Sequence, residues 1–351
     1  MSEHEKALRI LDQDGVVGIP TETVYGLAAR IDRPTGLRRI FETKQRPFFD
    51  PLIVHVSSME MAQRYSSDWP LLATALAREF WPGPLTLVVP KNELVPDLVT
   101  SGLGTVALRS PRHAKTLALI EAAQVGLAAP SANRFGRTSP TSWEHVLVEL
   151  GSDVFVLKDD PCEGGIESTI VKVDSSALHL LRAGLVTRDQ IEKCLQRAGL
   201  SFGWSNRDAL PSESAGRLEH HYMPDIPLVW IEGPTSFSQE PALTEKNLFQ
   251  IKEFLAQGRT SDPKRSLAST PSLTGLPTSP VAASPPTLGV QLLLPAEPSL
   301  AARKLYAELR SLSGSGADFI YFCNRSTMKG ELWEAILDRL TRAASLKISK
   351  E

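Results

Sequence analysis

The sequence predicts an α/β protein with two domains. Its 351 residues exceed one average domain, and 42% hydrophobic with 22% charged residues is the composition of an ordinary globular protein. Between residues 1 and 200, strand-like segments outnumber long helices and many connections are short, which favours a twisted mixed sheet over a strictly parallel one. Residues 290–344 alternate strand, helix, strand and helix, the pattern of a small parallel α/β layer.

The elements of the first 200 residues follow from apolar periodicity and from capping and turn residues. Ser2 and Glu5 have capping-box spacing at the start of an N-terminal helix. Pro47 ends a later helix, because a proline ring disfavours the helical conformation of the residue before it. We expect strands at residues 15–20, 52–56, 85–89, 105–109, 126–129, 154–157 and 178–181 and one opening at Glu167, with helices at residues 37–44, 59–80 and 187–199.

The rest of the chain divides into a linker and a second domain. Residues 201–228 are polar and turn-rich and contain His220, His221 and Tyr222, a cluster that is unusual for a mere spacer. In the second domain, residues 229–351, we expect residues 260–288 to be disordered because they are crowded with Pro, Ser and Thr. Expected strands are residues 228–232, 290–294 and 319–323, and expected helices are residues 243–256, 300–312 and 331–344.

Charge and cysteine content exclude several classes of protein. A net charge of -2 gives no overall attraction to nucleic acid or to anionic membranes. The three cysteines are widely separated and form no C-x-x-C pair, which argues against a disulfide framework and a zinc site and favours the reducing cytoplasm. The N-terminus resembles a charged helix start and not a signal peptide, and no apolar run approaches membrane-spanning length.

Two cations stand at the end of the helix that precedes Pro47. Lys44 falls at i+7 from Leu37, on the apolar face of that helix, where a charge is out of place, and Arg46 follows two residues later. They either complement the helix dipole as C-terminal cations or bind an anionic ligand.

Polar side chains also lie just past predicted strand ends, where ligands gather in open α/β folds. Thr21 and Thr23 follow the first strand, where they either cap a helix or hold a ligand. In the strand 105–109, Thr105 and Arg109 share one face, and Arg109 is either an anion clamp or one half of an ordinary salt bridge. His55 shares a strand face with Ile53 and is either a structural histidine or a ligand-binding one.

A serine- and asparagine-rich segment follows the strand 126–129. Its Ser131, Asn133 and Ser139 either donate to phosphate or base, or merely turn the chain. The sequence contains no G-x-x-x-x-G-K-[ST] phosphate loop and no nucleophile beside an obvious base. These observations indicate an anion-binding site that acts by positioning and charge neutralisation, as in phosphoryl and nucleotidyl transfer.

Seven motifs in one order resemble the threonylcarbamoyl-AMP synthase family with its YrdC-like domain. They are PTETVYGLAA, K-x-R (Lys44 and Arg46) with PLIVHV, FWPGPLTLV, VALRSP, PSANRFGRTSPT, ESTIVKV and LLRAG. The similarity covers roughly residues 5 to 200; HHYMPDIPL resembles the family's linker, and two C-terminal helices resemble its long, two-domain form. It implies a YrdC-like twisted mixed sheet followed by a smaller Rossmann-like domain.

The resemblance implies a nucleotidyltransferase that condenses L-threonine, bicarbonate and ATP into threonylcarbamoyl-AMP and pyrophosphate. The product would pass to a downstream tRNA threonylcarbamoyl transferase for threonylcarbamoyladenosine formation. Mg²⁺ is expected with ATP, the resemblance assigns no protein ligand to it, and neither stable nucleic-acid binding nor a membrane is expected. By matching motifs, the catalytic cations on the ATP phosphates are Lys44 and Arg46, helped by Arg182 and Thr105. The nucleotide would be held by Ser131, Asn133 and Ser139, and His221 and Tyr222 would close over ATP. Threonine would be held by Thr21, Thr23, His55, Arg109 and Ser168.

Three positions depart from the family pattern: Phe135 replaces a frequent second serine, Ala183 a common proline, and Met223 an alanine. Two other functions compete with the synthase. One is an RNA-binding module of the same fold, against which the balanced charge and the lack of aromatics among the basic residues speak. The other is carbamoyl transfer from carbamoyl phosphate, as in hydrogenase maturation proteins, whose zinc-finger and acylphosphatase-like segments this sequence lacks.

Overall fold

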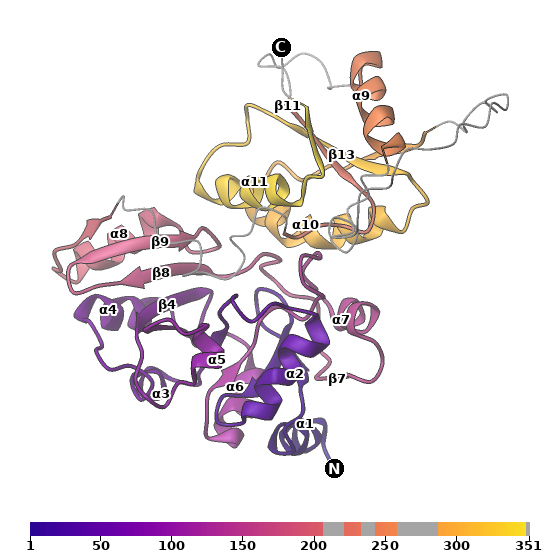
Figure 1. Cartoon of the computed structure of the whole chain (residues 1–351). Helices are drawn as coiled ribbons and strands as arrows, with labels where there is room; N and C mark the ends of the chain where they lie inside the picture. The colour runs from indigo at the N-terminus through magenta and orange to yellow at the C-terminus, as the bar shows by residue number, and fades with distance from the viewer. Residues whose placement is uncertain (206–220, 233–242, 258–286, 349–351) are drawn as a thin grey trace, which may run out of the picture.

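The computed structural model describes residues 1–205, 221–232, 243–257 and 287–348. Within these residues the chain forms a ten-stranded sheet and a four-stranded sheet, each with its own helices. Figure 1 shows the N-terminal part below and the C-terminal part above, with α10 (Pro298–Ser313) and α11 (Glu331–Ala343) on the side of the upper sheet that faces the lower part. The predicted α/β class is confirmed.

The large sheet is mixed, with strand order β10-β9-β8-β4-β5-β3-β6-β2-β1-β7. It contains both parallel pairs, such as β3 with β5, and antiparallel pairs, such as β4 with β5. Its strands are β1 Val17–Ile19, β2 Gly26–Arg30, β3 Ile53–His55, β4 Leu85–Pro90, β5 Thr105–Arg109, β6 Leu127–Ala128, β7 Phe155–Val156, β8 Thr169–Val173, β9 Ala177–Arg182 and β10 Gly203–Trp204. The predicted mixed sheet is therefore confirmed.

The helices of this domain pack an apolar core against the sheet. In α2, the buried side chains Leu37, Ile40 and Phe41 follow the predicted periodicity. The capping boxes at Ser2 and at Thr187 are both present. The helices are α1 Glu3–Asp12, α2 Pro34–Lys44, α3 Met59–Gln63, α4 Leu71–Phe80, α5 Asp97–Thr100, α6 Ala114–Ala123, α7 Trp143–Leu150 and α8 Arg188–Arg197.

One local expectation was wrong, and one of two alternatives is excluded. The single helix expected over residues 59–80 is two helices, α3 and α4, because Pro70 has extended backbone (ψ 151°) and stands at the N-cap of α4. The segment after β1 does not open a helix but turns back into β2, which pairs antiparallel with β1. The Thr21 hydroxyl makes that turn by donating to the Val24 carbonyl at 2.6 Å and accepting from the Thr23 N–H at 3.1 Å.

The second sheet is entirely parallel, as the strand and helix alternation predicted. Its order is β12-β13-β11-β14, and all three strand pairs are parallel. The strands are β11 Leu228–Glu232, β12 Gly289–Gln291, β13 Phe319–Asn324 and β14 Leu346–Ile348, and the helices are α9 Glu245–Ala256, α10 and α11. The expected linker between the domains and the Pro/Ser/Thr-rich segment fall largely on residues 206–220 and 258–286, outside the described residues.

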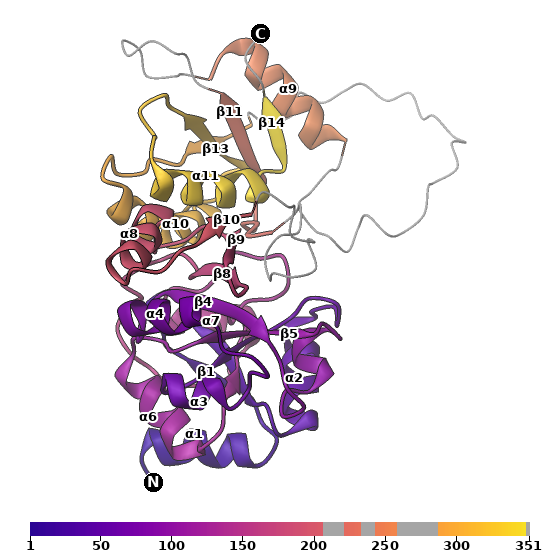
Figure 2. The same cartoon turned by 90° about the vertical axis from the view of Figure 1, so that its left-hand side faces the viewer.

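The two parts of the chain share a packed interface. Val24, Ile166 and Tyr222 belong to the same buried apolar cluster as side chains of α10 and α11. Gly165 adopts φ +74°, and a Cβ placed there would lie 2.4 Å from the Ala302 carbonyl oxygen of α10. The turned view shows the C-terminal layer stacked directly on the segments around β8 and β9 (Figure 2). A side chain of α10 or α11 can thus reach the first domain.

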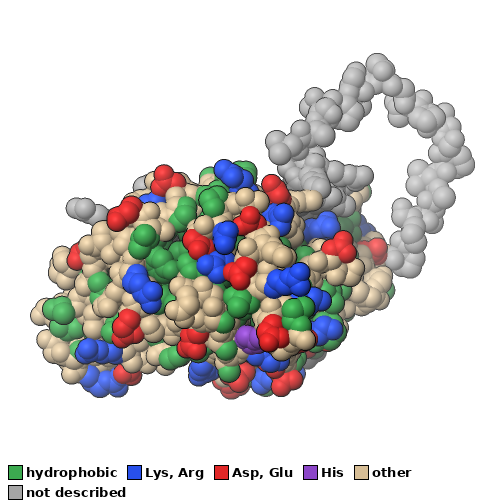
Figure 3. All heavy atoms as spheres, turned by 90° about the horizontal axis from the view of Figure 1, so that it is seen from below, with side chains coloured by type: hydrophobic (Ala, Val, Ile, Leu, Met, Phe, Trp, Pro, Cys, Tyr) green, Lys and Arg blue, Asp and Glu red, His purple; other side chains and the backbone are tan. Residues whose placement is uncertain are grey.

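The surface carries charges of both signs. On the face of the first domain opposite the C-terminal part, basic and acidic side chains are interspersed without a large area of one sign (Figure 3). Among the described residues, no helix combines the length and apolar character needed to cross a membrane. All three cysteines are described; they are buried and form no disulfide.

Candidate active site

A cavity lies at the edge of the large sheet where β3, β5 and β9 end and β8 begins. His55 and Arg109 are register partners at the ends of parallel β3 and β5, and Arg182 ends β9. Strands that end at a common edge bring such side chains together. The lining residues are Thr21, Thr23, Val24, Gly26, Arg46, Pro51, Ile53, His55, Arg109, Ala129, Pro130, Ser131, Glu167, Ser168, Arg182, His221 and Tyr222.

The cavity gathers most of the residues that the sequence singled out. Lys44, Asn133 and Ser139 do not line it: Lys44 donates to the lining residue Ser131, Ser139 donates to the lining residue Glu167, and the Asn133 carbonyl accepts from Lys44. Thr105 lies elsewhere, at the opposite end of β5 from Arg109, where its register partner is Pro90. The shared strand face of Thr105 and Arg109 therefore does not place both at one site, because five strand residues span about 13 Å.

The side chains of Arg46 and Lys44 contact different parts of the site, because α2 ends between the two residues. Gln45 has left-handed backbone (φ 52°), and the Arg46 N–H closes back onto the Phe41 carbonyl at 2.9 Å. The Arg46 guanidinium lines the cavity, forms an ion pair with Asp50 at 2.9 Å and donates to the Pro51 carbonyl at 2.9 Å. Its position is thereby fixed within its own loop.

Lys44 supports the wall formed by the segment after β6. Its side chain is fully buried, and Nζ donates to the Ser131 carbonyl at 2.5 Å and to the Asn133 carbonyl. Burial lowers the pKa of Lys44 well below its usual range, and the charge of Arg46 lowers it further. The ammonium thus holds the backbone of the predicted nucleotide segment.

Arg109 and His55 form the side of the cavity opposite this segment. Arg109 forms a buried ion pair with Glu22 at 2.7 Å, and its Nε donates to the Gly83 carbonyl at 3.2 Å. Burial, and then the charge of Arg109, lowers the pKa of His55 to about 3, so the imidazole is neutral near pH 7. His55 Nδ1 has no hydrogen-bond partner among the described residues, which leaves a polar atom for a ligand to satisfy.

Arg182 and Ser168 form a third wall. The Arg182 guanidinium donates to the Ser168 carbonyl at 3.1 Å and to the Ser168 hydroxyl at 3.2 Å. The Ser168 hydroxyl is also 2.7 Å from that of Thr86. Beside them the Glu167 carboxylate accepts from the Ser139 hydroxyl at 2.7 Å. The cavity therefore combines three arginines from three elements with hydroxyl groups and one carboxylate.

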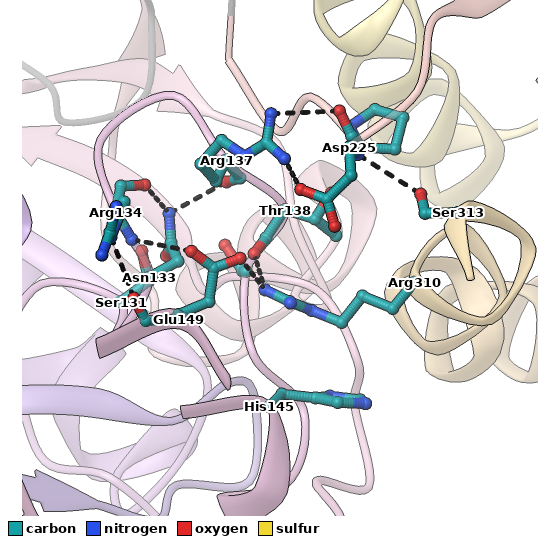
Figure 4. A network of polar contacts seen from close by, with 12 residues as sticks. Ser131, Asn133, Arg134, Arg137, Thr138, His145, Glu149, Asp225, Arg310 and Ser313 are labelled. Atoms are coloured by element: carbon teal, nitrogen blue, oxygen red, sulfur yellow. Dashed lines mark hydrogen bonds and ion pairs between the residues drawn. The ribbon is translucent and has the colours of Figure 1, made fainter. Parts of the chain in front are cut away.

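The segment 131–139 is held by hydrogen bonds within itself and by contacts with the second domain. The Asn133 amide donates to the carbonyls of Arg134 (2.7 Å) and Arg137 (2.9 Å), and the Asn133 Oδ1 has no hydrogen-bond partner among the described residues. Arg310 of α10 forms an ion pair with Glu149 at 3.0 Å and donates to the Thr138 carbonyl. Figure 4 shows this network continuing through Arg137 to Asp225. The second domain thus contacts the predicted nucleotide segment directly.

His221 and Tyr222 cover the cavity from the second domain's side. Tyr222 has φ +66°, an unusual backbone for a bulky residue, and its carbonyl accepts from the Thr138 hydroxyl at 3.1 Å. The His221 and Tyr222 rings lie 4.1 Å apart between centroids. Burial lowers the pKa of His221 to about 3, although the charge of Glu167 opposes this shift.

The three departures from the family pattern have structural correlates. The Phe135 ring meets the His221 ring edge to face, with centroids 6.2 Å apart, so an aromatic contact stands at the position of the family's frequent second serine. Ala183 and Met223 contribute backbone groups: the Ala183 carbonyl accepts from Arg339 at 2.7 Å, and the Met223 N–H donates to the Gly136 carbonyl at 2.8 Å. Side-chain identity matters little for such contacts.

Sequence reasoning gave no role to three acidic residues of the site: Glu22, Asp50 and Glu167. A carboxylate beside an anion site suggests repulsion, and only the fold shows that each one is paired with an arginine. The position of Glu22 between Thr21 and Thr23, and of Glu167 beside Ser168, was the available signal.

Comparison with known proteins identifies the family. The family model described as "Telomere recombination" (Sua5, YciO, YrdC) matches residues 9–184, and "Threonylcarbamoyl-AMP synthase, C-terminal domain" matches residues 186–345. The chain belongs to the Sua5–YciO–YrdC family, in its two-domain form.

Individual relatives and structures agree with this assignment. A protein named threonylcarbamoyl-AMP synthase from Pyrococcus abyssi is 39% identical over 62% of this chain and 65% of its own length. One of the same name from Bacillus subtilis is 39% identical over 65% of this chain and 66% of its own length. Each match thus spans just under two thirds of the relative's length. The crystal structure of P. abyssi Sua5 complexed with L-threonine matches with a TM-score of 0.77 and 28% identity, covering 100% of this chain and 97% of that one. A second P. abyssi Sua5 structure, in which a histidine and the tyrosine after it are both alanine, has a TM-score of 0.75 and 29% identity, covering 100% of this chain and 96% of that one.

Proposed function

We propose that this protein is a threonylcarbamoyl-AMP synthase, a nucleotidyltransferase that condenses L-threonine, bicarbonate and ATP. The observation that carries the proposal is the cavity itself, where Arg46, Arg109 and Arg182 converge from three elements beside hydroxyl groups and a neutral imidazole. The likeness to a threonine-bound relative over the whole chain supports it. The relatives' names and the interspersed surface charges favour an enzyme over an RNA-binding module.

The chemistry requires two bond-forming steps. The threonine ammonium first loses a proton; the resulting amine forms a bond to the bicarbonate carbon and water leaves, giving N-carboxy-threonine. A carbamate oxygen then attacks the α-phosphorus of ATP, the bond from that phosphorus to the bridging β-oxygen breaks, and pyrophosphate leaves. The product is a mixed anhydride of the carbamate and AMP. The protein contributes positioning and neutralisation of charge, since none of the proposed steps needs a covalent intermediate with a side chain.

Threonine would occupy the side of the cavity around Arg109. A guanidinium binds a carboxylate with charge-assisted hydrogen bonds, and Arg109 is held in place by Glu22 and Gly83. The unsatisfied Nδ1 of His55 and the hydroxyls of Thr21 and Thr23 supply polar contacts for the amine or the side chain. Ser168 completes this side.

ATP would lie between Arg46, Arg182 and the segment 131–139. The two arginines offer charge to the phosphates, while Ser131 lines the cavity and Asn133 and Ser139 order the wall behind it. Lys44 acts through this wall, because its ammonium is bonded to the carbonyls of Ser131 and Asn133. His221 and Tyr222 exclude water from the hydrolysable anhydride.

Mg²⁺ would enter with ATP. Among the described residues no three His, Cys, Asp or Glu side chains converge as a metal site, and the nearby carboxylates Glu22, Asp50 and Glu167 are each paired with an arginine. The residues present therefore do not fit a protein-held metal, and no step is assigned to one. A downstream tRNA threonylcarbamoyl transferase that receives the product, and a cytoplasmic location, stay predictions.

Pyrophosphate release tests the proposal. Purified protein is incubated with ATP and Mg²⁺, with L-threonine and bicarbonate present together or each left out. We expect release only when both are present. Release that is independent of threonine, or no release at all, would contradict the proposed function.

A further inference from the structure

A carboxylate in the cavity wall is held by two side chains of the second domain. Glu167 is 6% exposed and lines the cavity. Tyr306 donates its hydroxyl toward both carboxylate oxygens, at 3.1 and 3.0 Å, and Arg339 Nε donates to Oε2 at 3.0 Å. The third donor is the Ser139 hydroxyl, at 2.7 Å from Oε1. Both domains therefore meet at one carboxylate.

The two side chains from the second domain are themselves fixed. Arg339, on α11, is 1% exposed, and its NH1 donates to the carbonyls of Ala183 (2.7 Å) and Ala335 (3.0 Å). Tyr306, on α10, is fully buried and stacks on Tyr222 with ring centroids 5.7 Å apart. Groups locked in this way can dictate the orientation of the carboxylate that they contact.

The charge of Glu167 needs an explanation in a site for a polyanion. An ionised carboxylate at the wall repels phosphate unless a cation neutralises it. Burial by itself raises the pKa of Glu167, but the charges of Arg339 and Arg182 and the Ser139 hydrogen bond bring it below its usual range. Arg339 makes the ion pair, while the Arg182 guanidinium that lines the same cavity donates to Ser168. Without Arg339, Glu167 would be drawn toward Arg182 and would compete with phosphate for it.

We propose that Tyr306 and Arg339 are positioning residues of the active site, which act on ATP through Glu167. They orient the Glu167 carboxylate toward the second domain and Ser139. Arg182 can then bind the phosphates, and the Ser139 hydrogen bond holds the segment 131–139 in position. The second domain thereby completes the ATP half of the cavity. This inference rests on the proposed function of the cavity.

A double-mutant cycle tests the inference on the full chain. Arg339→Gln and Tyr306→Phe remove the donors, and Glu167→Gln removes the charge that they position. We expect Arg339→Gln to lower kcat/KM for ATP by about 10- to 100-fold, the usual effect of removing an outer partner that orients a site's ligands. When Glu167→Gln is already present, adding Arg339→Gln should lower kcat/KM for ATP by less than about twofold further. That is the limit within which the effects of independent sites add.

Two matched controls and one kinetic readout separate positioning from loss of structure. Arg197→Gln removes an arginine whose exposed ion pair is with Glu79, and Tyr65→Phe removes a hydroxyl that accepts from the Gly126 N–H away from the cavity. Both should keep kcat/KM within about twofold of wild type. The positioning variants should raise KM for ATP and leave KM for threonine within the same limit, because Arg109 lies outside the contacts of Glu167. If Arg339→Gln does not fold, Tyr306→Phe carries the test, since it keeps the stacked ring.

The outcomes distinguish this inference from the proposed function. Wild-type protein with threonine-dependent pyrophosphate release, together with fully additive effects in the cycle or equal changes in the two KM values, would overturn the positioning role alone. Wild-type protein without such release overturns the proposed function. The same cycle is then measured on the Kd of a non-hydrolysable ATP analogue, where non-additive losses support the role of Arg339 and Tyr306 and additive or absent losses overturn it.

Discussion

Lys44→Met separates the two roles that a buried lysine can have here. Methionine keeps the length of the apolar stem and removes only the ammonium, which donates to the carbonyls of Ser131 and Asn133. A buried carbonyl left without a donor costs about 1–3 kcal/mol. The Asn133 bond is buried and the Ser131 bond partly so. The free energy of unfolding should therefore fall by about 2–4 kcal/mol, counting the second carbonyl at a reduced cost.

Thermal unfolding and hydrogen exchange measure this effect. A change of that size lowers Tm by about 4–16 °C in a domain of this length, and amide exchange should accelerate across residues 131–139. Lys115→Met is the matched control: its ammonium also donates to a carbonyl, that of Lys158 at 2.6 Å, but the side chain is 40% exposed. We expect its effect to stay within about 0.5 kcal/mol.

One result would refute the wall-supporting role of Lys44. If Lys44→Met abolished pyrophosphate release while Tm and exchange of residues 131–139 stayed at wild-type values, the ammonium would act on the phosphates directly and not through the segment.

Three further predictions address the threonine side, pH and the domain interface. Arg109→Lys should raise KM for threonine by about 10- to 100-fold in steady-state kinetics, because a point charge cannot replace a charge-assisted guanidinium pair worth about 1.5–3 kcal/mol; an unchanged KM would place the carboxylate elsewhere. His55 has a folded pKa of about 3 against 6.5 unfolded, so the unfolded chain binds more protons between these values and stability is lost as pH falls through this window. In chemical unfolding at pH 7 and pH 4.5, His55→Gln should lose less stability than wild type, and an equal loss would contradict the neutral buried imidazole. Gly165→Ala should lower Tm more than Gly102→Ala, since both have positive φ but only at Gly165 would a Cβ meet the Ala302 carbonyl, at 2.4 Å; equal shifts would argue against tight packing of α10.

The sequence predicted those features of the fold and the site that depend on a local pattern of apolar and polar residues. The apolar periodicity of α2 placed Lys44 at the end of that helix, and the alternation in β5 placed Arg109 at a strand end. It failed at Pro70, which separates α3 from α4, and it left open a helix after Thr21, where the turn leads to β2.

The site's acidic residues depend on contacts that no local pattern contains. Glu167 meets Tyr306 and Arg339, which lie 139 and 172 residues away in the chain. Its charge is acceptable beside the proposed phosphate site because the second domain supplies an arginine. Conversely, Thr105 shares a strand face with Arg109 and yet lies away from the cavity, because a shared face does not fix position along a strand.

Incorporation of labelled bicarbonate tests the synthase function most directly. The full chain is incubated with ATP, Mg²⁺, L-threonine and isotopically labelled bicarbonate, and nucleotide products are analysed by mass spectrometry before the anhydride hydrolyses. We predict one labelled carbon in a conjugate of AMP with N-carboxy-threonine, formed in equal amount to pyrophosphate. Pyrophosphate release accompanied by AMP alone, or by a conjugate without the label, would contradict the function proposed for the cavity.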